Sequence, residues 1–154
     1  MIGLLQRVRH ARVDSEGECL AAIGPGLLVL VGIQRHDGAR ERDRLLERLL
    51  AYRVFPDEAG RMNRSLTDTG GGLLLVPQFT LAADTRKGNR PSFGAAAAPE
   101  HGAGAFAELV AAAEQTYAPV AAGRFGADMQ VALVNDGPVT FWLEAPPRSP
   151  DAAG

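Results

Sequence analysis

The sequence is short of the residues from which most metal and covalent sites are built. Its 154 residues include one cysteine, Cys19, and three histidines, His10, His36 and His101. A single thiol excludes an internal disulfide framework and a cysteine-based metal cluster, and the histidines are not spaced as a ligand pair. We therefore expect no metal and no cofactor. Cys19 lies in the segment GECLAAI and is predicted to fill the core from the inner face of a strand.

Long hydrophobic runs are also missing. The longest apolar stretch, residues 20–33, is interrupted by Gly24-Pro25-Gly26 and falls short of the roughly 20 residues that a membrane-spanning helix needs. The early arginines are not followed by the apolar segment and cleavage site of a signal peptide. We expect a cytoplasmic protein without a membrane partner, long enough for one domain with a full hydrophobic core.

The chain has little net charge, −2 at pH 7. Indiscriminate binding of long nucleic acids favours a basic protein, so a nucleic-acid partner would be held by a local patch or mainly by its end. The candidate patch is Arg86, Lys87 and Arg90, because no acid occurs between Thr85 and Pro99. A solvated basic loop is the simpler interpretation of such a cluster.

The periodicities predict an α+β fold in a single domain, residues 1–144. Strands are expected at 1–13, 18–23, 27–33, 52–55, 73–81, 128–135 and 139–144, and helices at 37–53 and 99–117. Strands that mostly pair antiparallel, with two main helices, favour a barrel-like sheet. The Pro-rich tail, 145–154, is predicted to be disordered.

The usual catalytic motifs are absent. The chain has no Gly-x-Ser-x-Gly elbow, no phosphate-binding glycine loop and no His-Glu-x-x-His helix. A polar cluster remains in VPQFTLAAD: if the strand continues, Gln78 and Thr80 share one face and Phe79 lies on the other. Ordinary hydrogen bonds to backbone or water are the alternative explanation for these two polar side chains.

The segment LVNDGPVTFW contains a strong turn signal. Asn135-Asp136-Gly137 predicts a tight hairpin between the last two strands. Pro138 follows at once and removes a backbone donor where the returning strand should begin to pair. The turn is therefore predicted to do more than reverse the chain, although a simple turn stop remains the alternative.

Three stretches taken together resemble the D-aminoacyl-tRNA deacylase family, from Met1 to about Leu143. They are QRV near the start, VPQFTLAADTRKGNRPSF and DMQVALVNDGPVTFW. The resemblance implies a homodimeric α+β enzyme that needs no metal. It implies cleavage of the ester between a D-amino acid and the 3′-terminal adenosine of tRNA, and removal of glycine from mischarged tRNA.

The resemblance also explains the proline. In the family, a cis Gly-Pro pair at the position of Gly137-Pro138 reaches from one subunit into the active site of the other. Its carbonyl oxygens hold the α-ammonium of the substrate, and its backbone occupies the space that an L side chain would need. Glycine, with no side chain, escapes this rejection. Arg7 matches a position that braces the Gly-Pro loop.

The catalytic residues implied by the resemblance are Gln78, Phe79 and Thr80, whose backbone N–H groups bind the adenosine end. One well-placed donor to an oxyanion is worth on the order of 10²–10³ in rate, and the 2′-hydroxyl of the substrate helps to activate water. Thr80 is then a positioning group, since no base is visible to activate it. Further residues are implied to bind the substrate (Pro77, Phe125, Met129) and tRNA phosphate (Arg86, Lys87, Arg90).

One residue departs from the family pattern. The usual stretch begins Ser-Gln-Phe-Thr, whereas Pro77 precedes Gln78 here. An animal branch that edits L-alanine also carries Pro-Gln, but without the following Phe and with a trans Gly-Pro; Phe79, Val139 and Thr140 place this chain with the D-specific group. Two alternatives stay open: a specificity shifted toward glycyl- or L-alanyl-tRNA, and a non-catalytic module that binds an RNA end or a protein.

Overall fold

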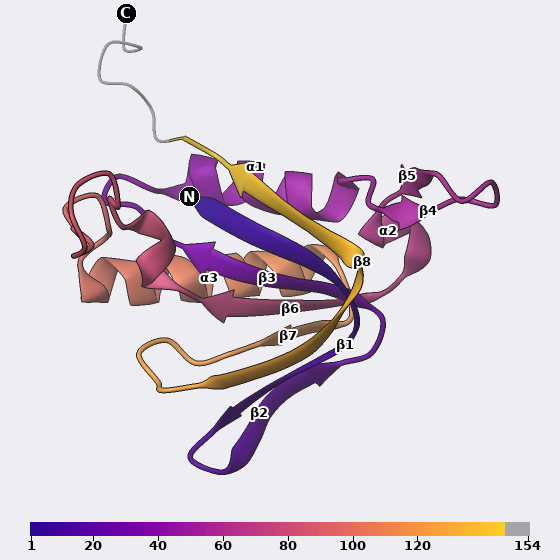
Figure 1. The fold of residues 1–154 in the computed structure, drawn as a ribbon, viewed down its shortest axis with the longest axis horizontal. Helices are drawn as coiled ribbons and strands as arrows, with labels where there is room; N and C mark the ends of the chain where they lie inside the picture. The colour runs from indigo at the N-terminus through magenta and orange to yellow at the C-terminus, as the bar shows by residue number, and fades with distance from the viewer. Residues whose placement is uncertain (147–154) are drawn as a thin grey trace, which may run out of the picture.

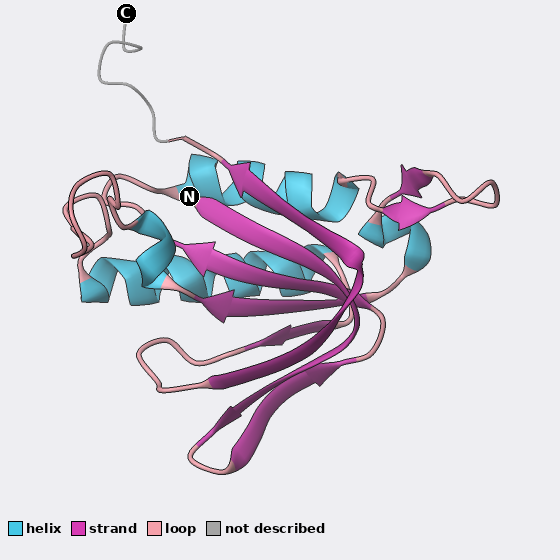
Figure 2. Ribbon diagram, viewed as in Figure 1, coloured by secondary structure: helices cyan, strands magenta, loops and turns pink. Residues whose placement is uncertain are grey.

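The computed structural model describes residues 1–146, which form one strongly bent main sheet with helices along it and a separate two-stranded sheet (Figures 1 and 2). The strands of the main sheet are β1 (Ile2–Ser15), β2 (Glu18–Ile23), β3 (Gly26–Gly32), β6 (Gly72–Pro77), β7 (Val120–Ala122) and β8 (Gln130–Glu144). The other elements are α1 (Ala39–Ala51), β4 (Phe55–Pro56), β5 (Met62–Arg64), α2 (Leu66–Thr69), the 3-10 turn η1 (Phe79–Ala82) and α3 (Pro99–Thr116). The predicted α+β fold with two main helices is confirmed.

Strand β1 organises the sheet because it has partners on both edges. Strand β8 pairs antiparallel with it along one edge. On the other edge, the first half of β1 pairs with β3 and the second half with β2, both antiparallel. Strands β6 and β7 then continue from β3 in parallel. The resulting sheet is mostly antiparallel and curls toward a barrel, as predicted.

The predicted hairpin at Asn135-Asp136-Gly137 is wrong. Residues 130–144 form one strand, β8, whose two halves pair with successive parts of β1 and not with each other. The register shifts between Gln6 and Val8, where β8 carries extra residues. Because β1 runs unbroken past this point and pairs with both halves, the turn-forming residues are accommodated as a bulge, and the chain keeps its direction.

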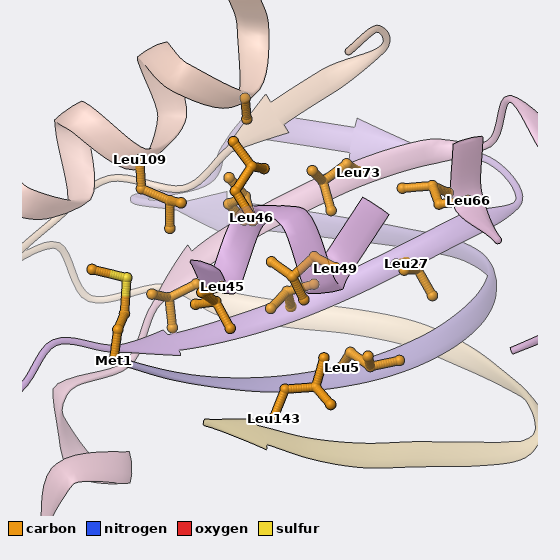
Figure 3. Packing of buried hydrophobic residues seen from close by; sticks show 14 of the residues in the cluster. Met1, Leu5, Leu27, Leu45, Leu46, Leu49, Leu66, Leu73, Leu109 and Leu143 are labelled. Atoms are coloured by element: carbon orange, nitrogen blue, oxygen red, sulfur yellow. The ribbon is translucent and has the colours of Figure 1, made fainter. Parts of the chain in front are cut away.

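Strands β3 and β6 are buried on both faces, which explains their apolar runs. Leu27 and Leu73 point toward the helices and pack in one cluster with residues such as Leu45 of α1 and Leu109 of α3. Figure 3 shows these side chains gathered between the helices and the strands. The following residues, such as Leu28 and Leu74, face the inside of the bend and form a second cluster.

Cys19 does not fill the core as predicted, because its side chain is exposed. It lies two residues after the turn at Gly17, opposite Asp14. The ladder between β1 and β2 shifts register between Val13 and Asp14. A shift of this kind changes which face a side chain occupies, and here it leaves the thiol in solvent.

The two ends of the described chain meet. The α-ammonium of Met1 is fully buried and donates to Asp37 Oδ1 and to the carbonyl oxygen of Ala145, both at 2.7 Å. Ala145 is itself buried, so the first residue of the predicted tail belongs to the fold, and residues 147–154 lie outside the described residues. None of the helices in residues 1–146 is both long and apolar enough to cross a membrane.

Candidate active site

A cavity of about 310 Å³ opens at the carboxyl end of β6. This is where ligands commonly bind beside parallel strands, and β6 runs parallel to β3. Five of the sequence-predicted site residues line the cavity: Pro77, Gln78, Phe79, Phe125 and Met129. The structure thus brings together two segments that are about fifty residues apart in the sequence.

The floor of the cavity forms where β6 stops. The N–H of Gln78 donates to Val31 O at 2.7 Å, and the chain then turns into η1. The strand therefore does not continue through Thr80, and the prediction that Gln78 and Thr80 share a strand face is wrong. The two side chains meet nonetheless, because Gln78 Nε2 donates to Thr80 Oγ1 across the turn.

The start of this turn leaves backbone donors free. In residues 1–146, no hydrogen bond uses the N–H of Phe79 or Thr80, as expected at the first residues of a helical turn. Thr80 is exposed, and the partner of its hydroxyl is an amide. An amide cannot serve as a general base, so the geometry offers Thr80 no activation as a nucleophile.

The opposite wall is the loop between β7 and β8. Phe125 packs against Gly102 of α3, where an added Cβ would come within 2.9 Å of the ring. The loop is also tied to β1, since Ser15 Oγ donates to Asp128 O at 2.8 Å. Asp128 lines the cavity as well. Asp128 was not predicted as a site residue from the sequence. Its position next to Met129 was the only feature of the sequence that pointed to it.

The Gly137-Pro138 pair lies in the β8 bulge. Four residues, 136–139, stand opposite the single residue Arg7 of β1, and the Gly137–Pro138 peptide bond is cis. Gly137 has φ +152°, and a Cβ on it would lie 2.6 Å from the backbone nitrogen of Val139. Only glycine fits this conformation without displacing the bulge.

Two side chains hold the bulge at its ends. Arg7 Nε donates to Asp136 O at 2.8 Å and its Nη1 to Val54 O at 2.6 Å. Asn135 Oδ1 accepts the N–H of Val139 at 2.7 Å, and its Nδ2 donates to Thr140 Oγ1 at 3.0 Å. The bracing role expected of Arg7 therefore has a geometric basis, whereas sequence reasoning did not identify Asn135 as a second brace.

Within one chain, the bulge and the cavity are far apart. Arg7 pairs with Leu27, which pairs with Leu73 at the start of β6, whereas the cavity lies at the other end of β6. Three strand spacings across the sheet and five residues along β6 correspond to on the order of 20 Å. The structure of the single chain does not bring Pro138 to Gln78.

The predicted basic cluster lies in a loop closed by a bridge between Asp84 and Ser92. Arg86 is engaged there, since its Nε and Nη2 donate to the two carboxylate oxygens of Asp84 at 2.9 and 2.7 Å. These hydrogen bonds lower the pKa of Asp84 to about 2. Lys87 and Arg90 make no ion pair within the described residues, so they present the free charge of the loop.

Metal ligands do not gather in the described part of the chain. Across residues 1–146, no three side chains of His, Cys, Asp or Glu come together in a way that could hold a metal ion. The cavity itself has one ionisable side chain among its lining residues, Asp128.

Comparison with known proteins finds relatives along nearly the whole chain. The family description "D-Tyr-tRNA(Tyr) deacylase" matches residues 4–144. D-aminoacyl-tRNA deacylases from Alkalilimnicola ehrlichii and Thioalkalivibrio sulfidiphilus are each 65% identical, covering 97% and 96% of this chain and 99% of their own lengths.

Solved structures share the fold. A structure described as a c-Myc DNA unwinding element binding protein is 40% identical, with a TM-score of 0.90 over 95% of this chain and 99% of its own. A probable eukaryotic D-amino acid tRNA deacylase, 19% identical, has a TM-score of 0.74 over 94% of this chain and 98% of its own. The chain belongs to the D-Tyr-tRNA(Tyr) deacylase family.

Proposed function

We propose that this protein hydrolyses the ester bond of D-aminoacyl-tRNA and releases the D-amino acid and tRNA. The observation that carries the proposal is the cavity at the end of β6. It is lined by Gln78 and Phe79 from the stretch that resembles the deacylase motif, and its size is typical of a small-molecule site. Substantial identity to D-aminoacyl-tRNA deacylases over nearly the whole chain supports the same activity.

The chemistry follows from what the cavity contains. The free N–H groups of Phe79 and Thr80 are suited to stabilise the negative charge that develops on the ester carbonyl oxygen when water attacks. An aminoacyl ester is already reactive, so this stabilisation and correct placement replace a nucleophilic side chain. The 2′-hydroxyl of the terminal ribose assists the attacking water, and the 3′-oxygen of the adenosine leaves.

The active unit is a homodimer in this proposal. Gly137 and Pro138 are exposed in the single chain and are on the order of 20 Å from the cavity by strand spacing. A site that uses both the bulge and Gln78 therefore requires a second copy. Trp142 of β8, which is 51% exposed, provides apolar surface near the bulge for such an interface.

Chiral selection is assigned to the bulge contributed by the second copy. Carbonyl oxygens of Gly137 and Pro138 hold the α-ammonium, and their backbone excludes an L side chain by steric conflict. Glycine lacks the side chain that this conflict requires, so glycyl-tRNA is also a substrate. The protein acts in the cytoplasm, and no residue in this scheme requires a metal.

A second candidate keeps the fold but shifts specificity toward glycyl- or L-alanyl-tRNA. The observation that favours it is Pro77, which lines the cavity where the family usually has serine. Competition between D-Tyr-tRNA and glycyl-tRNA distinguishes the two candidates, because the second predicts that the glycyl ester is strongly preferred.

The decisive experiment measures deacylation of D-Tyr-tRNA and L-Tyr-tRNA by the purified protein with excess chelator. We expect rapid loss of the D ester and persistence of the L ester. Equal cleavage of both esters, or cleavage of neither, contradicts the proposal. Binding of aminoacyl-tRNA without turnover supports instead a non-catalytic module that binds the RNA end.

A further inference from the structure

An exposed pair of aromatic rings stands at the rim of the cavity. The ring centroids of Phe79 and Phe93 lie 5.2 Å apart with the planes inclined by 47°. The two residues are 57% and 40% exposed, among the few large apolar side chains in residues 1–146 that reach solvent to this degree. Phe79 lines the cavity, whereas Phe93 does not. The pair therefore extends the cavity wall outward onto the surface.

The backbone on both sides of Phe93 is held in place. Asp84 and Ser92 exchange two backbone hydrogen bonds, of 2.7 and 3.0 Å, directly before it. After it, Ala96 N–H donates to Phe93 O at 3.1 Å, and Arg35 N–H donates to Ala95 O at 2.9 Å. The last of these bonds joins the loop to the segment that follows β3. The backbone that carries Phe93 is thus held in place, which lowers the cost in backbone conformational entropy when a ligand binds.

The loop that leads to Phe93 carries positive charge. The loop closed by the bridge between Asp84 and Ser92 carries Lys87 and Arg90, both exposed and unpaired among the described residues. Arg35 is exposed on the neighbouring segment. The acid of this loop, Asp84, is neutralised by Arg86. Exposed aromatic faces beside free cations are the combination that binds single-stranded nucleic acid, by stacking on bases and by contact with phosphates.

We propose that the Phe79–Phe93 pair is a stacking platform for the unpaired nucleotides that precede the 3′-terminal adenosine of tRNA. The inference rests on the proposed function, which places the terminal aminoacyl-adenosine in the cavity. The RNA strand must then leave the cavity past its rim, and the bases at the single-stranded tRNA end are free to stack there. The cations of the loop contact the phosphates of the same nucleotides.

The test compares two substrates that differ only upstream of the terminal adenosine. D-Tyr-tRNA contains the nucleotides that the platform would bind, and the ester D-tyrosyl-adenosine lacks them. We expect Phe93→Ala to lower kcat/KM for D-Tyr-tRNA about tenfold or more, the size expected from loss of one base stack. For D-tyrosyl-adenosine, the change should stay below about twofold on the same reasoning.

Two further substitutions separate stacking from packing. Phe93→Trp keeps an aromatic face and should retain most of the activity on tRNA. Phe93→Leu keeps apolar bulk but lacks an aromatic face. It should fold even if the alanine variant does not, and it should still show the loss of kcat/KM that is specific to D-Tyr-tRNA. Met62→Ala is the matched control, because Met62 is 50% exposed on β5, outside the cavity lining, and should change neither substrate.

The outcomes distinguish this inference from the proposed function. If the wild-type protein cleaves neither substrate, the proposed function fails and the platform fails with it. If the wild-type cleaves both and Phe93→Ala alters both equally or neither, the platform alone is overturned. A loss of dimer in sedimentation, without a tRNA-specific effect, would show that the rings form a subunit contact instead.

Discussion

Asn135 closes the β8 bulge onto Val139: its Oδ1 accepts the Val139 N–H at 2.7 Å, a donor that the β1 ladder does not use. The exposed pair Gly137-Pro138 lies between these two residues. A side-chain amide thereby replaces the missing strand partner and holds a four-residue excursion at its base. The bulge is a defined structure because of this contact and that of Arg7, and the proposed selectivity depends on its shape.

Replacing Asn135 by alanine should weaken discrimination more than it weakens the fold. Asn135→Ala removes the side-chain hydrogen bonds to Val139 and Thr140, and each lost hydrogen bond costs about 1 kcal/mol of stability. A displacement of about 1 Å in a site can cost on the order of 100-fold in rate. We expect the ratio of D-Tyr-tRNA to L-Tyr-tRNA deacylation to fall at least about tenfold on this basis. Asn135→Asp keeps an acceptor for Val139 and should recover part of the ratio. An unchanged ratio in the alanine variant would mean that Arg7 alone positions the bulge.

Freeing Arg86 should strengthen the interaction with tRNA. Its hydrogen bonds lower the pKa of Asp84 to about 2. A carboxyl whose pKa is lowered in the folded state stabilises the fold at pH values above its ordinary pKa, about 3.9. This stabilisation disappears as the pH falls through about 2. The pair is thus intact at neutral pH. In the Asp84→Asn variant, log kcat/KM should fall more steeply with the logarithm of the salt concentration. The slope should change by at most about one unit, as expected for one additional phosphate contact.

The matched control for Asp84→Asn is Asp43→Asn. Asp43 accepts from Arg42 at 2.9 Å on the exposed surface of α1, so this change also removes one surface carboxylate beside an arginine. It should leave the salt dependence unchanged. Equal steepening in both variants would point to net charge and not to a local contact by Arg86.

Asp37→Asn should destabilise the fold strongly. Asp37 is buried, and its carboxylate accepts from the Met1 ammonium and from the N–H of Gln34, each at 2.7 Å. Removal of one member of a buried ion pair costs about 3–5 kcal/mol, because the remaining charge loses its compensation. The free energy of unfolding in urea measures this loss. Glu108→Gln, at an exposed pair with Arg42, should cost about 1 kcal/mol at most.

Gly32→Ala should disturb the turn beneath the cavity. A Cβ at Gly32 would lie 3.0 Å from Leu81 Cβ and 3.4 Å from Gln78 O, so η1 must shift away from β3. We expect a loss of about 1–3 kcal/mol in unfolding free energy together with lower kcat on D-Tyr-tRNA. Gly104→Ala in α3, which meets nothing within 4 Å, should stabilise the helix by about 0.5–1 kcal/mol and leave kcat unchanged.

Much of the secondary structure could be predicted because short-range patterns dictate it. The apolar run at 27–33 and the helical spacing of Leu45, Leu46 and Leu49 correspond to β3 and α1. Periodicity records which face of an element is buried, and burial is the main source of stability for these elements. Long segments with a strong hydrophobic pattern can therefore be predicted from the sequence alone.

The candidate site depended on the motif resemblance and on contacts between distant residues. No local pattern links Gln78 to Phe125, and their meeting at one cavity follows from the pairing of β7 beside β6 in the sheet. The turn signal at Asn135-Asp136-Gly137 failed because turn propensity is a local preference, and a long continuous partner strand outweighs it.

Residue chemistry along the chain thus determined most of the helices and strands and the membership in a family. Folding in three dimensions decided that β8 continues past its turn residues without reversing, that Cys19 faces water and that Pro138 stands far from Gln78 in its own chain. The physical reason is the range of the forces involved. Propensity acts over a few residues, whereas strand pairing and burial depend on partners that lie dozens of positions away.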